Sequence, residues 1–197
     1  MSNTTERRSV AIYYAELRNF TRLSEVLQPD KVLALANEFF SLVAMAITAN
    51  RGKILSVQND ALLAVYAGAD KKDFAERALK SAQDVQREFG AVGERWKAEY
   101  GLPASVASAL HLGEAVFGMA GPIGAQQFVA FGDCVSIGER LVHRARSGEV
   151  VISLDFMKAL GATVQTLGAQ ELPSLEIPKR PPLAIYGIAL ETRLDFT

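Results

Sequence analysis

The sequence contains few of the residues that build disulfides and structural metal centres. Among 197 residues it has one cysteine, Cys134, two histidines and one tryptophan. A single cysteine excludes an internal disulfide, and two histidines with one cysteine argue against a structural zinc site. This cysteine usage is typical of a reducing compartment, so we expect a cytoplasmic protein.

An excess of charge of either sign is also missing. The formal net charge is −1, so the chain lacks the basic excess that a nucleic-acid groove needs, and we expect no nucleic-acid partner. Unbroken apolar runs stay short of the ~20 residues of a membrane span, and residues 1–9 are too polar for a signal peptide. We therefore expect no membrane partner either.

Apolar residues, in contrast, are plentiful. Hydrophobic residues make up 49% of the chain and charged residues 22%, which predicts a packed core. The length suits one domain. We expect this domain at residues 9–190, after a disordered lead-in at 1–8 and before a tail at 191–197.

Strand-like and helix-like patterns alternate along the chain. Residues 10–15 form a nearly unbroken apolar run that predicts a central strand covered on both faces. Apolar positions with the helical period predict long helices at 31–49 and 70–100, and Gly52 is expected as a left-handed cap. The order β-α-α-β-β-α-β-β-α-β predicts helices flanking a mixed sheet. Further strands are expected at 53–58, 61–67, 104–112, 114–120, 150–152, 164–167, 175–177 and 183–189.

A first candidate site lies where the central strand ends. Glu16 can hold a divalent cation there, and the amides of the following loop, which opens a helix, favour anions. The loop residues are Leu17, Arg18, Asn19, Phe20 and Thr21. The alternative is an exposed glutamate followed by an ordinary threonine helix cap.

Asp60 follows Asn59 in a predicted two-residue hairpin turn. If this hairpin pairs with the first strand, Glu16 and Asp60 lie at adjacent strand ends and form a plausible two-metal site. The alternative is a polar hairpin tip without a ligand.

A second candidate site lies at residues 130–141, where a Gly132-Asp133 turn opens a helix. We expect Asp133 at the helix N-cap. Ser136 and Arg140 are four residues apart, so they project from one helix face and could hold a ribose and a phosphate. The alternative is a capped amphipathic helix with an arginine facing solvent.

Four blocks of the sequence resemble the motifs of class III adenylate/guanylate cyclases, in the family's order. Residues 15–21 (AELRNFT) are similar to Asp-(Ile/Leu)-x-Gly-Phe-Thr, and residues 59–66 (NDALLAVY) to the Gly-Asp hairpin. Residues 109–116 (ALHLGEAV) resemble Gly-Ile-His-Thr-Gly-Glu-Val-Val, and residues 131–141 (FGDCVSIGERL) resemble Gly-Asp-x-Val-Asn-x-Ala-x-Arg-Leu. With the elements between them, the resemblance covers nearly the whole chain.

This resemblance implies a ferredoxin-like mixed sheet flanked by helices, and a head-to-tail homodimer with sites at the subunit interface. It also implies a reaction in which the ribose 3′ oxygen of a nucleoside triphosphate attacks the α-phosphate and releases pyrophosphate. Two Mg²⁺ or Mn²⁺ ions, held by carboxylates of one subunit, would assist this transfer. Positioning and charge neutralisation account for most of such catalysis.

The family's residues carry over unevenly. Glu16 and Asp60 correspond to the two metal-binding aspartates, and the longer Glu16 predicts a weakened metal site. Arg140 corresponds to the transition-state arginine, and Ser136 stands where the family has the asparagine that orients ribose. Asn19 replaces a loop glycine, and asparagine is among the least costly substitutes where φ is positive.

The base-recognition positions differ from both branches of the family. Ser56 and Val129 stand where adenylate cyclases have lysine and aspartate or threonine, and where guanylate cyclases have glutamate and cysteine. Lys179, or Arg180, is expected as a further triphosphate-binding residue. Two hypotheses follow: a divergent nucleotide cyclase, or a catalytically inactive cyclase-like module that binds nucleotide, polyphosphate or a partner chain.

Overall fold

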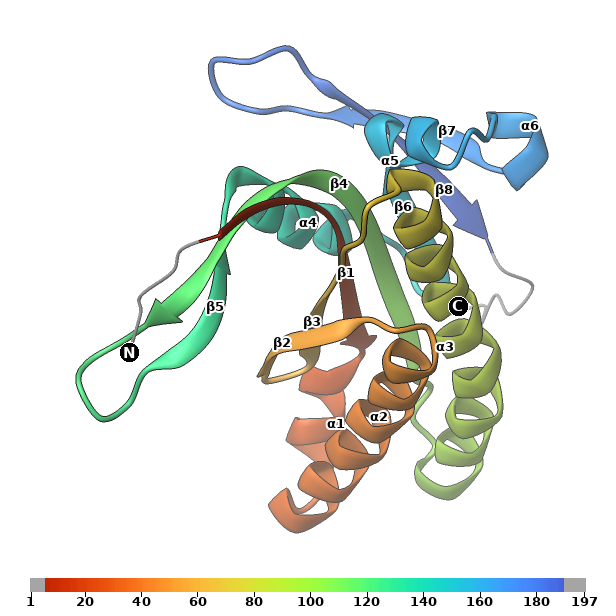
Figure 1. The fold of residues 1–197 in the computed structure, drawn as a ribbon. Coiled ribbons are helices and arrows are strands. Elements are labelled where there is room, and N and C mark those ends of the chain that lie inside the picture. Colours follow the sequence, from red (N-terminus) through yellow and green to blue (C-terminus); the bar gives the residue numbers. More distant parts are fainter. Residues whose placement is uncertain (1–5, 190–197) are drawn as a thin grey trace.

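A computed structural model describes residues 6–189. Within them, eight strands form one mixed sheet in the order β2-β3-β1-β4-β6-β8-β7, with β5 paired to β4 (Figure 1). The parallel β4–β6 pair makes the sheet mixed, since the other pairs are antiparallel. The strands are β1 (Glu6–Arg18), β2 (Lys53–Gln58), β3 (Ala61–Tyr66), β4 (Ser105–Ala120), β5 (Gln127–Phe131), β6 (Glu149–Ser153), β7 (Gln170–Leu175) and β8 (Leu183–Ala189).

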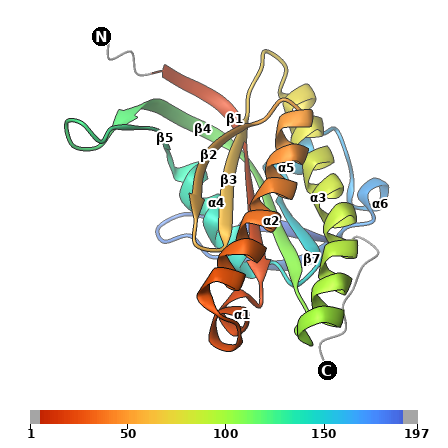
Figure 2. The ribbon, with the colours of Figure 1, turned by 90° about the horizontal axis from the view of Figure 1, so that it is seen from below.

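Helices cover both faces of the sheet, as the view in Figure 2 shows. One face carries α2, α3 and the shorter α1 and α5, while α4 covers the opposite face. The predicted mixed sheet flanked by helices is therefore confirmed. The helices are α1 (Phe20–Val26), α2 (Pro29–Ala49), α3 (Lys71–Tyr100), α4 (Asp133–Arg144), α5 (Leu154–Ala159) and α6 (Val164–Leu167).

The central position of β1 follows from its apolar run. This strand pairs on one side with β3 and on the other with β4. Its alternate side chains serve two separate clusters: Ala11, Tyr13 and Ala15 pack under α2 and α3, while Val10 and Ile12 face the other side. The predicted strand at residues 10–15, covered on both faces, is confirmed.

Two strand predictions, both for central strands, differ from the structure. Residues 6–8, expected in a disordered lead-in, form the start of β1 because they pair with residues 115–117 of β4. Residues 1–5 and 190–197 lie outside the described part, as does the expected tail at 191–197. The two strands expected around Gly113 are one continuous strand, β4. Gly113 does not form a turn. Its missing side chain lets α4 pack closely, since a Cβ there would lie 2.4 Å from the Cβ of Cys134.

Local capping accounts for three further differences. Residues 164–167 are the short helix α6 rather than a strand, because Thr163 and Thr166 form a reciprocal capping box. Arg51 (φ 59°), not Gly52, takes the left-handed conformation after α2. Asp133 is the first residue of α4, and Gly132 stands at the N-cap without a side-chain cap.

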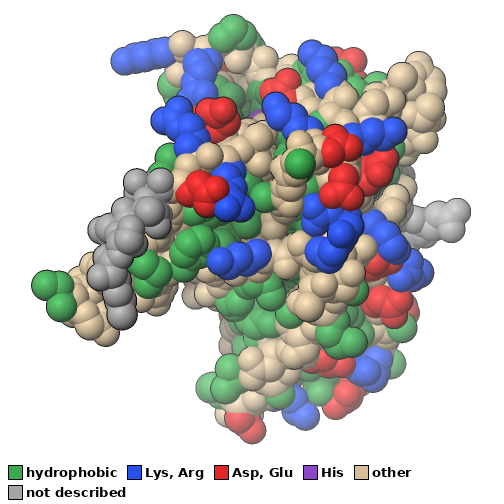
Figure 3. Space-filling view, viewed as in Figure 1, with side chains coloured by type: hydrophobic (Ala, Val, Ile, Leu, Met, Phe, Trp, Pro, Cys, Tyr) green, Lys and Arg blue, Asp and Glu red, His purple; other side chains and the backbone are tan. Residues whose placement is uncertain are grey.

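Among the described helices, α2 is long and apolar enough to cross a membrane by length and composition. A core helix of a globular protein meets the same criterion, and α2 buries Leu35, Phe39 and Val43 against the sheet and α3. Other apolar side chains of α1 and α2 are exposed, among them Val26, Leu33 and Met45. Figure 3 shows hydrophobic side chains at the surface in its lower half.

His111 is buried in β4, and it gives stability a pH dependence. Its Nδ1 lies 2.8 Å from the Oγ of Ser153, and burial lowers the pKa of His111 to about 4, from 6.5. The unfolded chain therefore binds this proton more readily, and the stabilisation present above pH 6.5 is lost as the pH falls towards 4.

We predict that this histidine makes the native state about 2 kcal/mol less stable at pH 5 than at pH 7.5. Urea denaturation at the two pH values measures the loss. His111→Gln removes the titrating group, so its loss over the same interval is smaller by that amount. Equal losses in both proteins would contradict the prediction.

Candidate active site

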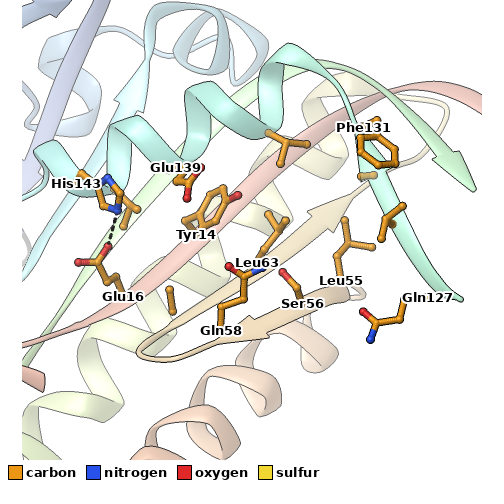
Figure 4. Close-up of a pocket in the computed structure, with 15 residues that line it drawn as sticks. Tyr14, Glu16, Leu55, Ser56, Gln58, Leu63, Gln127, Phe131, Glu139 and His143 are labelled. Carbon is orange, nitrogen blue, oxygen red and sulfur yellow. Dashed lines mark ion pairs between the residues drawn. The ribbon is translucent and has the colours of Figure 1, made fainter. Parts of the chain in front are cut away.

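A pocket of about 340 Å³ opens between α4 and the ends of four strands, β1, β2, β3 and β5 (Figure 4). Glu16 lines it from β1, Ser56 from β2 and Val129 from β5. The structure thus brings a predicted metal ligand and both predicted base-recognition positions to one cavity. Other lining side chains with polar groups are Tyr14, Gln58, Gln127, Glu139 and His143.

Glu16 lies beside the C-terminal end of α4, where its carboxylate is close to the side chains of Arg18 and His143. It is 9% exposed, and its carboxylate accepts a hydrogen bond from Arg18 Nη1. His143 Nε2 of α4 lies 3.5 Å from the other carboxylate oxygen, a pair that Figure 4 marks. A cation that binds Glu16 must therefore compete with groups of the chain itself.

Arg18 also joins β1 to the end of α4. Its Nη2 donates to the carbonyl oxygens of Val142 and Ala145, at 2.5 and 2.7 Å. The last four carbonyls of a helix have no partner within it, so Arg18 satisfies two acceptors there and places positive charge at the negative end of the helix dipole.

Asp60 lies close to Glu16 through the backbone. In the β1–β3 register Glu16 is opposite Ala61, and Leu17 N donates to Asp60 O at 2.8 Å. Asn59, with φ of 48°, makes the tight turn that the sequence predicts. The hairpin tip is thus beside the end of β1, although the Asp60 side chain is not part of the pocket lining.

These two positions offer oxygen ligands, which suit Mg²⁺ or Mn²⁺. No cluster of three His, Cys, Asp or Glu residues capable of holding a metal occurs among the described residues. Magnesium is commonly held by one or two carboxylates together with substrate phosphates. Glu16 and Asp60 therefore fit an ion that is shared with a triphosphate, rather than one that the protein holds alone.

Residues 17–21, expected as an anion-binding loop, are instead the end of β1, the single connecting residue Asn19 and the start of α1, and they serve mainly for packing. Leu17 is 1% exposed and Phe20 packs against the same core under α2. Asn19 adopts φ of 70°, and its Nδ2 donates to Pro103 O at 2.7 Å. Thr21 is exposed on α1. Of these five residues, Arg18 is the one whose side chain contacts Glu16, the residue that lines the pocket.

Polar side chains that the sequence analysis did not select complete the pocket. Tyr14 and Glu16 are two residues apart on β1, so strand alternation could have identified Tyr14 as a neighbour. Glu139 points towards Tyr14 in Figure 4. Burial, together with the Glu139 charge, raises the pKa of Tyr14 to about 12, so the phenol stays protonated at neutral pH. No such sequence signal marks His143.

Arg140 and Lys179 line a different hollow, of about 690 Å³, with the rest of loop 176–181. Arg140 Nη2 donates to the backbone oxygen of Glu176 across this hollow. Ser136 is exposed on α4 and lines neither cavity. The residues expected to act on the phosphates and ribose are thus separated, within one chain, from the pocket that contains Glu16.

Three features together define a nucleotide cyclase-like domain. They are a mixed sheet with helices on both faces, a carboxylate at the end of its central strand, and an arginine on α4. A family model described as the adenylate and guanylate cyclase catalytic domain matches residues 3–183. The chain belongs to this family.

Two curated relatives named as adenylate cyclases are much longer than this chain. Adenylate cyclase 1 of Rhizobium meliloti (strain 1021) is 30% identical over 138 residues, which are 68% of this chain and 20% of the relative. The terminal-differentiation-specific adenylate cyclase of Dictyostelium discoideum is 24% identical over 195 residues, 95% of this chain and 9% of the relative. The chain therefore spans a fifth or less of these two proteins.

Solved structures share the fold over almost the entire chain. The adenylyl cyclase CyaB from P. aeruginosa has a TM-score of 0.87 at 18% identity, with 98% of this chain and 100% of that chain covered. The guanylyl cyclase Cya2 has a TM-score of 0.83 at 25% identity, with 96% and 94% covered.

We predict that Arg18→Ala lowers the free energy of unfolding by roughly 2–3 kcal/mol, because the buried Glu16 carboxylate loses its arginine and the carbonyl oxygens of Val142 and Ala145 each lose a donor. Arg18→Lys recovers only part of this, since one ammonium cannot reach all three acceptors. Urea denaturation measures both. The control, Arg22→Ala, breaks an exposed ion pair with Glu25 and costs little. An Arg18→Ala protein as stable as this control would contradict the prediction.

Proposed function

We propose that the chain is a divergent class III nucleotide cyclase that converts a nucleoside triphosphate into a cyclic nucleotide and pyrophosphate. The observation that carries the proposal is the Leu17–Asp60 backbone hydrogen bond, which brings the hairpin tip to the strand end that bears Glu16. Two carboxylate positions at adjacent strand ends are the arrangement that metal-assisted phosphoryl transfer requires.

Glu16 and Asp60 would hold Mg²⁺ or Mn²⁺ in this proposal. The ions, when bound, would neutralise charge on the phosphates and on the attacking and leaving oxygens. Arg18 already neutralises part of the Glu16 charge, and His143 Nε2 lies 3.5 Å from the same carboxylate, so we expect the metal site to be weaker than one with free carboxylates.

The remaining residues would position the substrate. The ribose 3′ oxygen attacks the α-phosphorus while the bond to the β-phosphate oxygen breaks, and the 3′ hydroxyl proton leaves to solvent as pyrophosphate departs. Arg140 and Lys179 supply positive charge for the phosphates, and Ser136 supplies one hydroxyl for the ribose. A serine reaches less far than an asparagine, which favours a slow enzyme.

We further propose a homodimer in which each site is shared. Arg140 and Lys179 line a hollow separate from the pocket of Glu16, so a second chain is the natural source of these residues for that pocket. Large apolar side chains are exposed beside the pocket on β2 and β5. They are Val57 (50% exposed), Phe128 (38%) and Phe131 (64%), and burying them would favour association.

Base selection is expected to be relaxed. Ser56 offers one hydroxyl and Val129 none, and the nearby amides of Gln58 and Gln127 can each present either a donor or an acceptor. Such a lining does not discriminate strongly between adenine and guanine. We therefore expect ATP and GTP to be used with similar efficiency.

A second candidate is a catalytically inactive module that binds a nucleotide or polyphosphate. The ion pair between Glu16 and Arg18 favours it, because the chain itself supplies a cation at the metal-binding carboxylate. Phosphate binding would then rely on Arg140 and Lys179 without turnover.

We predict slow formation of cyclic nucleotide and pyrophosphate in equal amounts from ATP or GTP with Mn²⁺. Arg140→Ala is expected to lower the rate roughly 100- to 1000-fold, as loss of a transition-state donor does. Ser136→Asn is expected to raise it. Chromatography of the nucleotides and an enzyme-coupled pyrophosphate assay measure both products.

Arg87→Ala, which removes an exposed arginine of α3 that pairs with Asp84, serves as the control for this assay. Nucleotide binding by calorimetry without product from either base, in the wild type and in Ser136→Asn, would favour the inactive module instead.

A shared site also makes a prediction about mixtures. Asp60→Ala and Arg140→Ala should each be inactive alone, because every site of each homodimer lacks one essential group. In an equal mixture half of the dimers are mixed, and each of these has one intact site of two, so about a quarter of wild-type activity returns. No recovery, or a monomer by sedimentation at micromolar concentration, would contradict the shared site.

A further inference from the structure

One face of α4 holds β7 and the segment that follows it, residues 176–182, at three points. Asp133, Arg140 and Arg144 are spaced by seven and four residues, so their side chains lie along the same side of the helix. Asp133 binds Arg180, Arg140 donates to Glu176 O, and Arg144 Nη2 donates to Pro173 O at 3.2 Å. The segment is therefore docked on the helix that carries the predicted catalytic arginine.

The pair of Asp133 and Arg180 has the strongest geometry of the three. The two terminal guanidinium nitrogens, Nη1 and Nη2, donate to the two carboxylate oxygens, each at 2.6 Å, in a bidentate arrangement that fixes orientation as well as distance. The hydrogen bond from Arg180 lowers the pKa of Asp133, so the carboxylate is charged at neutral pH. Asp133 does not cap its own helix, and its carboxylate is committed to the loop.

This pairing bears on Lys179, the neighbour of Arg180. Lys179 has φ of 63°, an unusual conformation for a residue other than glycine, which persists only where the surroundings hold it. Arg180 N closes the turn by donating to Ile177 O at 3.1 Å. With Arg180 fixed on Asp133, Lys179 stays at the hollow that Arg140 also lines.

We propose that Asp133 and Arg180 are a positioning pair that holds loop 176–181 on α4, so that Lys179 and Arg140 bind the same triphosphate. The ligand rests on the proposed function, whereas the docking of the loop does not. Both side chains of the pair are about half exposed, at 49% and 51%, so the ion pair adds little to global stability. The ion pair instead keeps loop 176–181 ordered before the phosphates bind.

The test uses tripolyphosphate as the probe, with calorimetry for affinity and hydrogen exchange for the order of residues 176–182. Asp133→Asn and Arg180→Gln are each expected to weaken binding about tenfold, because the loop must then be ordered on binding. Exchange in the loop rises in both variants, while the unfolding temperature hardly changes. The charge-exchanged protein, with Asp133→Arg and Arg180→Asp, regains loop protection and most of the affinity.

Arg87→Gln removes an exposed pairing arginine on α3 and should alter neither measurement. Unchanged loop exchange in Asp133→Asn and Arg180→Gln would overturn the positioning role. Loop protection without recovered affinity in the charge-exchanged protein would also overturn it, because Arg180 would then contact phosphate directly. If the wild type binds neither tripolyphosphate nor nucleotide, the proposed function fails, while hydrogen exchange still decides whether the pair orders the loop.

Discussion

The guanidinium of Arg18 connects the central strand, the last turn of α4 and the carboxylate of Glu16. Its three acceptors come from two elements that are more than a hundred residues apart in sequence, and a planar group with several fixed donors can hold all of them at once. The wall of the pocket formed by α4 and the position of its one buried carboxylate, Glu16, both depend on this contact.

Small residues let α4 lie close enough for that contact to form. A Cβ on Gly138 would approach Ile12 Cγ2 to 2.8 Å, and one on Gly113 would meet Cys134 at 2.4 Å. The helix therefore packs directly on β1 and β4, and its two ends reach different partners. The C-terminal end meets Glu16 through Arg18 and His143, while the N-terminal end binds Arg180 through Asp133.

This arrangement gives one helix two roles in the proposed chemistry. Towards its own sheet, α4 closes the pocket that contains Glu16, Ser56 and Val129. Along its other side it carries Arg140 beside Lys179. In the proposed mechanism these are the two halves of one site, and their separation within the chain suits catalysis between subunits.

The sequence by itself determined the elements whose signals are local. An apolar run specified the central strand at 10–15, the helical period specified α2 and α3, and Asn59-Asp60 specified a tight turn. Four motif blocks sufficed to indicate the family. Residues 164–167 were an exception. They were expected to form a strand, but the capping box of Thr163 and Thr166 stabilises a short helix there.

The tertiary structure alone decided which side chains meet. Arg18 contacts partners 124 and 127 residues away, and Asp133 pairs with Arg180, 47 residues away, whereas the sequence predicted it as the cap of its own helix. The tertiary structure likewise decided that Arg140 and Glu16 line different cavities. Such pairings depend on how the sheet and α4 pack. Hydrophobic periodicity reports local secondary structure, so it does not reveal which distant residues will be in contact.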